Sequence, residues 1–143
     1  MLVSDILRKK DSTIYKTTPD TNILDAIAHL NEHNIGSLLV LSDEDLAGII
    51  TERDIMRAIG KNDTELAQFT VGDLMTKSLI VCEPGEKLDK IMVLMTEKRI
   101  RHLPVMDGGV LKGIISIGDV VKARLQEIEM EAQELKDYIR GVR

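Results

Sequence analysis

GIITERDIMRAI, residues 48–59, is the stretch that decides the fold. Its apolar run stops at Thr51, and an amphipathic pattern begins at Asp54, three positions later. Thr-x-x-Asp at such a junction is typical of a helix capping pair, in which each side chain accepts a bond from the other residue's backbone N–H. The same spacing could hold a polar ligand over a helix N-terminus. The stretch therefore predicts a strand followed by a helix, and leaves a second role for the pair open.

The stretch has a second copy further along the chain. A shift of 65 positions places GIITERDI (48–55) on GIISIGDV (113–120), IGSLLVL (35–41) on IRHLPVM (100–106) and TPDTNILDAI (18–27) on EPGEKLDKIM (83–92). Upstream, VSDIL (3–7) resembles VGDLM (71–75) at a slightly different offset. So many matches indicate an internal repeat. We predict repeat 1 at residues 1–62, repeat 2 at 63–125 and a helical extension at 126–143.

Each repeat predicts the same order of elements. A short extended segment (14–16; 79–81) is followed by a helix with one apolar stripe. Two β-rich runs then flank a tight turn at 42–45 or 107–110, and a second helix starts after Thr51 and after Ser116. A polar connector at 60–68 separates the repeats. The stripes consist of Ile23, Ala26, Ile27 and Leu30, and of Leu88, Ile91, Met92 and Met95.

The order β-α-β-β-α, found twice, predicts an α/β fold. One unit of about 60 residues is marginal by itself, because two helices cover one face of its sheet and leave the other face bare. We therefore expect the two sheets to pack together as a module with pseudo-twofold symmetry. Ligand sites often lie at such internal interfaces, in this case in clefts between the halves.

The composition excludes several classes of function. The chain has 143 residues, 43% of them hydrophobic, and no apolar run long enough to span a bilayer. A formal charge of −5, one Phe, two Tyr and no Trp argue against nucleic-acid binding, which needs a basic face and stacking aromatics. The N-terminus MLVSDILRKK lacks the order of a signal peptide, and the single Cys82 excludes an intramolecular disulfide. We expect a cytoplasmic protein without nucleic-acid or membrane partners.

The repeated pattern resembles the CBS-domain family. The resemblance is carried by GIITERD, GIISIGD, NIGSLLV and RIRHLPV, each at the place the family expects, and it covers roughly residues 1–125. Two such repeats in tandem look like a CBS pair, also called a Bateman module. The resemblance implies regulatory binding of an adenosine nucleotide, with no cofactor required.

The family's ligand contacts carry over onto matching positions. The Asp that closes the Thr/Ser-x-x-Asp motif commonly bonds the ribose hydroxyls, and the Thr or Ser that opens it contacts ribose or phosphate. Adenine usually lies against the first short strand, and basic residues before the next strand often meet phosphates. The implied residues are Thr51, Asp54, Ser116 and Asp119 in the motifs, Ile14, Tyr15, Lys16, Ile80 and Val81 along the first strands, and Arg99, Arg101 and His102 near phosphate, with the uncharged Gly36 and Ser37 at the equivalent place in repeat 1.

The chemistry of the residues supports this binding mode independently. A carboxylate accepts bonds from both vicinal hydroxyls of a ribose, and a helix N-terminus offers N–H donors and partial positive charge to a phosphate. Arg53 lies beside Asp54 as a further phosphate candidate, and its counterpart in repeat 2 is Gly118. We therefore expect two unequal sites. Capping alone is the simpler interpretation of each pair, and the two roles are compatible.

Other chemistry-bearing residues form no convincing site. His29-Leu30-Asn31-Glu32-His33 matches the H-x-x-E-H pattern of some zinc proteases, but no third ligand is evident. We interpret both histidines as polar positions beside the apolar stripe. Cys82 follows the apolar residues 79–81, which indicates a buried strand residue rather than a nucleophile. We predict neither an enzyme nor a metal site.

The second helix of repeat 2 continues unusually far. Its apolar residues recur at spacings of four and three, which indicates an a/d-like seam of roughly two and a half heptads. Because such a seam must be buried, we predict a homodimer in which this tail can take part, with a monomer whose tail folds back as the alternative. The seam consists of Val121, Leu125, Ile128, Ala132, Leu135 and Ile139.

The sequence is compatible with two alternative functions, a regulatory ligand-binding module and a ligand-free scaffold. In the first, the chain is a stand-alone regulatory module that binds AMP, ADP, ATP, NAD or S-adenosylmethionine and signals to an unidentified effector protein. The alternative is a ligand-free scaffold for dimerisation or interaction. The sequence does not choose among the nucleotides, because the implied residues contact the adenine and ribose that they share.

Overall fold

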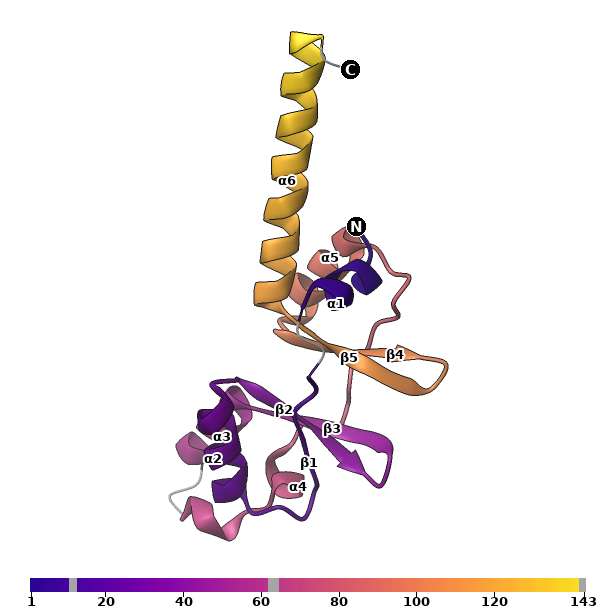
Figure 1. The fold of residues 1–143 in the computed structure, drawn as a ribbon. Helices are drawn as coiled ribbons and strands as arrows, with labels where there is room; N and C mark the ends of the chain where they lie inside the picture. Colours follow the sequence, from indigo (N-terminus) through magenta and orange to yellow (C-terminus); the bar gives the residue numbers. More distant parts are fainter. Residues whose placement is uncertain (11–12, 62–64, 142–143) are drawn as a thin grey trace. The chain divides into compact units, whose positions relative to one another are not determined.

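The structure, a computed structural model, describes residues 1–10, 13–61 and 65–141. Its contacts divide the chain into two compact units, one made of Met1–Thr13 with Ile80–Arg143 and the other of Ile14–Leu79 (Figure 1). Each unit has its own sheet and hydrophobic core, so each is described by itself. Part of the predicted connector, residues 62–64, lies outside the described residues. Within the described ranges, no helix is long and apolar enough to cross a membrane.

The unit of residues 14–79 is built on a sheet with the strand order β1-β2-β3. β1 (Lys16–Thr17) runs parallel to β2 (Ser37–Ser42), which pairs antiparallel with β3 (Asp45–Thr51). The helical elements are α2 (Ile23–His33), α3 (Glu52–Lys61), the 3-10 turn η1 (Leu66–Gln68) and α4 (Val71–Leu74). The core consists of Ile23, Ala26, Leu30, Leu38, Val40, Ile50, Ile55 and Val71.

The other unit contains the N-terminal helix and the second half of the chain. Its elements are α1 (Val3–Lys9), α5 (Leu88–Lys98), the antiparallel pair β4 (His102–Asp107) and β5 (Val110–Ser116), and α6 (Ile117–Arg140). Figure 1 shows that α6 extends well past α1 and α5. The core consists of Val3, Ile6, Cys82, Leu88, Ile91, Met95, Leu103, Val105, Ile115, Val120 and Ala123.

The predicted repeat reappears in the backbone of the two units. Ser37 faces Thr51 across one hairpin, and His102 faces Ser116 across the other. Both hairpins carry a register shift at the equivalent position. Each first helix also ends in a left-handed residue at the equivalent place, with φ 52° at position 34 and φ 54° at position 99. The α/β class and the long C-terminal helix are therefore confirmed, whereas the packing of one sheet on the other stays a prediction.

The short helix that opens each repeat in the sequence packs on the other repeat. α1 lies at the start of repeat 1, yet the Val3 N–H donates to the carbonyl of Glu86 in repeat 2 at 2.9 Å. In the same way the Val71 N–H, at the start of α4, donates to the Thr21 carbonyl at 2.8 Å. Both valines are fully buried, each in its own core. The predicted boundaries at 62/63 and 125/126 follow the sequence, and they do not coincide with these two compact units.

The first strand differs between the repeats. In repeat 1 the Leu39 N–H donates to the Tyr15 carbonyl at 3.1 Å, next to β1, which lies slightly later than the predicted segment 14–16. The equivalent of Leu39 in repeat 2 is Pro104, which has no N–H to donate. Only a bridge between Cys82 and Val105 forms there. The predicted extended segment at 79–81 therefore does not become a strand, because proline removes one bond of its ladder.

Candidate functional site

The Thr51–Asp54 pair lies where β3 passes into α3. The Asp54 N–H donates to Thr51 Oγ1 at 3.2 Å, and the Thr51 N–H donates to Asp54 Oδ2 at 3.0 Å. The Thr51 hydroxyl also donates to Oδ2, at 3.0 Å, and the Thr76 hydroxyl donates to Oδ1 at 3.0 Å. The predicted capping pair is thus present. It holds a half-buried carboxylate in one orientation at the positive end of a helix.

The Ser116–Asp119 pair repeats this arrangement where β5 passes into α6. The Ser116 N–H donates to Asp119 Oδ2 at 2.9 Å, and the Asp119 N–H donates to Ser116 Oγ at 3.2 Å. Here the additional partner is a cation: Lys10 Nζ lies 2.8 Å from Asp119 Oδ2 and donates to the Ile114 carbonyl at 2.8 Å. Partial burial raises the pKa of Asp119, but the bonds from Lys10 and Ser116 outweigh it, so the pKa lies below its ordinary value.

Strand register sets the surroundings of both motifs. The Glu52 N–H donates to the Gly36 carbonyl at 3.1 Å, and the equivalent Ile117 N–H donates to the Arg101 carbonyl at 2.8 Å. Residues 36–37 and 101–102 therefore lie beside their motifs, as the repeat predicts. Because β1 runs parallel to β2, the residues just before β1 reach the same end of the sheet. Each unit thus gathers its own share of the implied ligand residues at one sheet end.

The side chains of the implied phosphate residues differ in exposure. Arg53, Arg99 and Arg101 are exposed, whereas His102 is half-buried. Arg99 is the C-cap of α5 and adopts a left-handed backbone, a conformation that costs a residue with a Cβ roughly 1–2 kcal/mol. Its counterpart in repeat 1 is Asn34, the residue type that tolerates this conformation best after glycine. The residues around the two motifs thus differ, and two unequal ligand sites stay a prediction.

Sequence reasoning missed two residues that hold the carboxylates. Thr76 and Lys10 both follow the short opening helices, α4 and α1, and so come from the segments exchanged between repeats. The similarity of VSDIL to VGDLM was the available signal. This similarity did not indicate which carboxylate each segment would reach. The answer depends on the packing of each opening helix on the other repeat, which only the structure shows.

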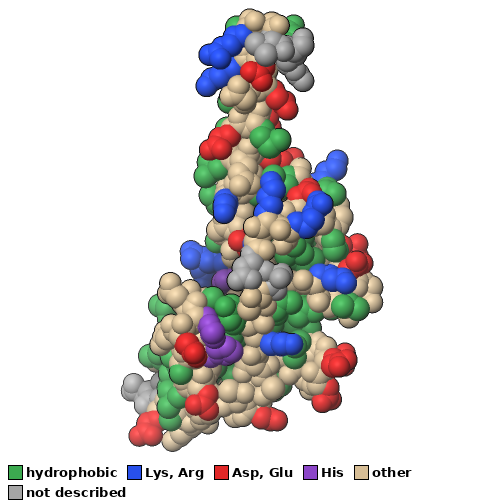
Figure 2. Space-filling view, viewed as in Figure 1, with side chains coloured by type: hydrophobic (Ala, Val, Ile, Leu, Met, Phe, Trp, Pro, Cys, Tyr) green, Lys and Arg blue, Asp and Glu red, His purple; other side chains and the backbone are tan. Residues whose placement is uncertain are grey.

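Tyr15 packs on the two histidines of α2 in the unit of residues 14–79. Its ring centroid lies 4.3 Å from that of His33 and 6.1 Å from that of His29, and the two imidazole centroids are 4.8 Å apart. Figure 2 shows the purple His patch on the surface of this unit. Across the described residues, no group of three His, Cys, Asp or Glu side chains is arranged to hold a metal ion.

Cys82 is a core residue and only 1% exposed. Burial, with a smaller contribution from the charge of Glu86, raises the pKa of its thiol to about 12. A thiol of this kind is inert at neutral pH, because the thiolate is the nucleophilic form. The interpretation of Cys82 as a structural residue is consistent with this environment.

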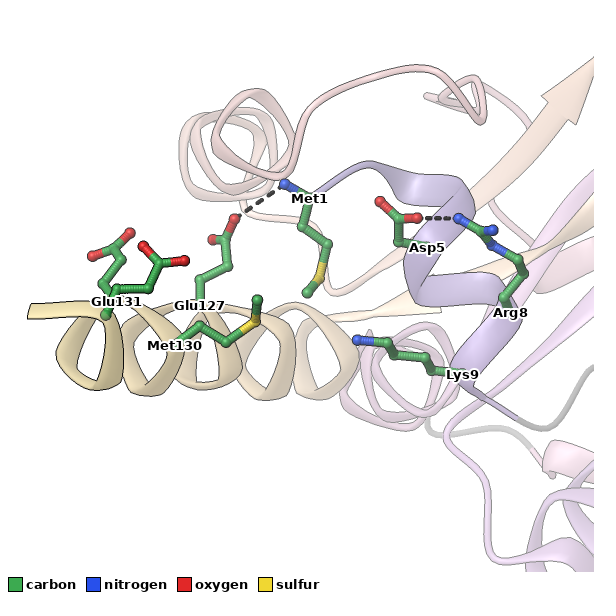
Figure 3. Close-up of a pocket in the computed structure, with 8 residues that line it drawn as sticks. Met1, Asp5, Arg8, Lys9, Glu127, Met130 and Glu131 are labelled. Atoms are coloured by element: carbon green, nitrogen blue, oxygen red, sulfur yellow. Dashed lines mark hydrogen bonds and ion pairs between the residues drawn. The ribbon is translucent and has the colours of Figure 1, made fainter. Parts of the chain in front are cut away.

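A groove of about 630 Å³ lies between α1 and α6, and none of the implied ligand residues lines it (Figure 3). Much of its charge is already paired. The Met1 amino group lies 3.2 Å from Glu127 Oε2, Arg124 lies 3.3 Å from Glu127 Oε1, and Arg8 pairs with Asp5. This groove is therefore separate from the two motifs. It is lined by Met1, Asp5, Arg8, Lys9, Glu127, Met130, Glu131 and Glu134.

Comparison with known families decides the assignment. The model of the CBS domain matches residues 3–61 and again residues 71–126. The chain belongs to the CBS-domain family. The predicted resemblance is thereby confirmed, and the two matches correspond to the two repeats of a CBS pair.

Two relatives match this CBS pair over most of its length. The CBS domain-containing protein CBSX3, mitochondrial, of Arabidopsis thaliana is 40% identical over 149 residues, covering 97% of this chain and 72% of its own length. A putative signal-transduction protein with CBS domains from Burkholderia ambifaria is 43% identical, with a TM-score of 0.85 over 88% of this chain and 95% of its own.

Two similar solved structures contain adenosine ligands. CBSX2 in complex with AMP is 30% identical, with a TM-score of 0.75, and the match covers 87% of this chain and 97% of that one. The CBS pair of protein MJ0100, in complex with 5-methylthioadenosine and S-adenosyl-L-methionine, is 26% identical, with a TM-score of 0.77 over 89% and 98% of the two chains.

Proposed function

We propose that this CBS pair is a regulatory module that binds an adenosine nucleotide through its Thr51–Asp54 and Ser116–Asp119 motifs. The observation that carries the proposal is that both motifs hold a half-buried carboxylate in fixed orientation at a helix N-terminus. The bonds from Lys10 and Ser116 both go to Oδ2 of Asp119, so its Oδ1 is placed to accept ribose hydroxyls without first having to be ordered. Asp54 already accepts three bonds, so a second ribose hydroxyl there would replace the bond from Thr76 or from the Thr51 hydroxyl. The adenosine ligands of CBSX2 and MJ0100 support this class of ligand.

Charge around the motifs distinguishes the two sites. The unit that contains Ser116 and Asp119 also supplies Lys10, Arg99 and Arg101. Lys10 uses two of its three N–H donors on Asp119 and the Ile114 carbonyl, which leaves one for a phosphate oxygen. Near Asp54 the extra partner is the neutral Thr76 hydroxyl, and Arg53 is the adjacent cation. Phosphorylated ligands therefore prefer the Ser116–Asp119 motif in this proposal.

The first experiment is a thermal-shift screen of nucleotide-free protein with AMP, ADP, ATP, NAD, S-adenosylmethionine and 5-methylthioadenosine. A ligand present at 100 times its dissociation constant stabilises the folded chain by about 2.7 kcal/mol. We expect a shift with at least one of these compounds. The absence of a shift with all of them would favour the alternative function, a ligand-free dimerisation scaffold.

The second experiment separates ribose binding from helix capping. Asp119→Ala should weaken binding roughly 10- to 100-fold, the loss expected for a bond to a charged group, and Asp54→Ala tests the other motif. Asp73→Ala is the matched control, because Asp73 forms the same reciprocal box with Thr70, at 2.9 and 3.3 Å, outside both motifs. The control should lose stability and keep affinity. Unchanged affinity in the double variant Asp54→Ala, Asp119→Ala would refute the assignment of these carboxylates as ribose-binding groups.

The output of the module is part of the same proposal. Ligand binding changes the population of conformations only through a difference in affinity between them, so a separate effector protein must detect the favoured state. We propose no enzyme activity, a cytoplasmic location and a homodimer as the working form. The effector would be sought by comparing proteins that co-purify with the wild type and with the Asp119→Ala variant.

A further inference from the structure

The seam of α6 is exposed in the single chain. The residues at the start of the helix that face the rest of their unit, Val120 and Ala123, are 2% and 4% exposed. The large seam residues are 46% to 75% exposed, along a stretch of about 27 Å at the helical rise. Figure 2 shows hydrophobic side chains on this protruding helix. Among the described residues, the structure thus shows no tail folded back over the seam, which is formed by Val121, Leu125, Ile128, Ala132, Leu135 and Ile139.

The spacing of the seam sets a heptad register along α6. Position a is occupied by Leu125, Ala132 and Ile139, and position d by Val121, Ile128 and Leu135. The flanking positions, e and g, decide which partner a coiled-coil helix accepts and in which direction. Position e holds Lys122, Glu129 and Lys136, and position g holds Arg124, Glu131 and Tyr138.

These charges are complementary to a parallel second copy in register. In that arrangement each g residue faces the e residue of the next heptad in the partner. Arg124 then meets Glu129 of the second copy, and Glu131 meets Lys136 of the second copy. Symmetry doubles both pairs, so every charged g residue finds an opposite charge. Arg124 also lies 3.3 Å from Glu127 in its own chain, but its five donors can serve both carboxylates.

An antiparallel second copy fits the same helix less well. Over the full seam, antiparallel pairing sets e against e and g against g. Glu129 would then face Glu129 of the second copy, Glu131 would face its own counterpart, and Lys122 would face Lys136. Sliding the helices past each other by one heptad restores opposite charges, but it leaves Val121 and Leu125, or Leu135 and Ile139, without a partner. Only the parallel register pairs all six seam residues and also gives each charged g residue an oppositely charged partner.

We propose that the seam of α6 binds the same seam of a second copy as a parallel, in-register, two-stranded coiled coil. This inference names the surface of the proposed homodimer and does not depend on nucleotide binding. Of the α6 residues that line the groove beside α1, Glu127, Met130 and Glu134 lie off the seam, whereas Glu131 both lines the groove and occupies position g. Two CBS pairs would then be joined at the same end of their long helices.

Cysteine cross-linking of the full chain tests the direction. Val121→Cys places a thiol at a d position, and only the parallel register brings residue 121 of both chains together. In glutathione redox buffer we expect most of this variant to become a disulfide-linked dimer of about twice 16.0 kDa. The native Cys82 is buried and does not interfere. Gln133→Cys, at an exposed b position, is the matched control and should stay monomeric on a denaturing gel.

Charge reversal tests the pairing by an independent readout. Lys136→Glu should raise the dimer dissociation constant in analytical ultracentrifugation by roughly tenfold, because two symmetry-related pairs become repulsive. Adding Glu131→Lys should restore the wild-type value in a parallel dimer. In the full-seam antiparallel arrangement Lys136 faces Lys122 of the second copy, so Lys136→Glu would instead lower the dissociation constant. A lower dissociation constant for Lys136→Glu, its rescue by Glu129→Lys as expected of the slid antiparallel register, equal cross-linking of the two cysteine variants, or an assembly of more than two chains would overturn the proposal.

Discussion

Gly48 and Gly113 occupy equivalent positions in the two repeats, and replacing each with alanine should have very different consequences. A Cβ at Gly48 would lie 2.7 Å from the backbone carbonyl of Thr76 and 2.9 Å from the sulfur of Met75. A Cβ at Gly113 would meet only Leu7 Cδ2, at 2.9 Å, which is the far end of a flexible side chain. The first contact can be relieved only by moving backbone, and the second by rotating the Leu7 side chain.

The expected magnitudes follow from what must move. Overpacking against a fixed group costs about 1–3 kcal/mol. Displacing Thr76 also strains two bonds that join it to Ile49, at 2.9 and 3.1 Å, each worth about 1 kcal/mol. Gly48→Ala should therefore lower the free energy of unfolding by about 2–4 kcal/mol. Gly113→Ala should cost less than about 1 kcal/mol, since alanine also recovers about 0.5–1 kcal/mol of backbone entropy within a strand.

Urea denaturation followed by circular dichroism measures both values, and a chain without Trp favours this signal over fluorescence. Gly48→Ala should also weaken ligand binding at the Thr51–Asp54 motif, because Thr76 holds the Asp54 carboxylate. Adding Met75→Ala should recover only part of the lost stability, since the carbonyl contact remains. If Gly113→Ala were as destabilising as Gly48→Ala, the distinction between backbone and side-chain neighbours would be refuted.

Three further changes test other contacts. Lys10→Met should lower the urea midpoint at pH 7, because Lys10 pairs with Asp119 and helps to hold the pKa of that carboxyl below its ordinary value. This stabilisation is complete at pH values above the ordinary pKa of Asp and is lost as the carboxyl protonates, so the difference from wild type should shrink below about pH 4. An equal difference at pH 7 and pH 3 would contradict this. Arg99→Gly should raise the free energy of unfolding by about 1 kcal/mol by removing the left-handed strain, and no gain would show that other contacts hold this residue. Cys82, whose pKa is raised to about 12, should react with a thiol reagent at pH 8 only as fast as the chain unfolds, and rapid labelling of native protein would be inconsistent with its burial.

Much of the fold was predictable because its signals are local. The stripes at Ile23 and Leu88 begin α2 and α5, and the hydroxyl at the end of each apolar run marks where α3 and α6 begin. The prediction was less accurate where the deciding partner is distant in sequence. Residues 79–81 have strand-like composition, but they do not form a strand because Pro104, more than twenty positions later, cannot donate the bond that Leu39 supplies in repeat 1.

The candidate site shows the same difference between local signals and partners that are distant in sequence. The sequence alone determined the two carboxylates, Asp54 and Asp119, and their capping hydroxyls, because a capping box closes within three residues and appears in both repeats. Only the tertiary structure decided which side chain lies next to each carboxylate, Thr76 in one unit and Lys10 in the other. Thr76 and Lys10 follow short helices that each pack on the other repeat. The burial of Val71 and Val3 in the two cores determines where these helices lie, and this packing is long-range in sequence.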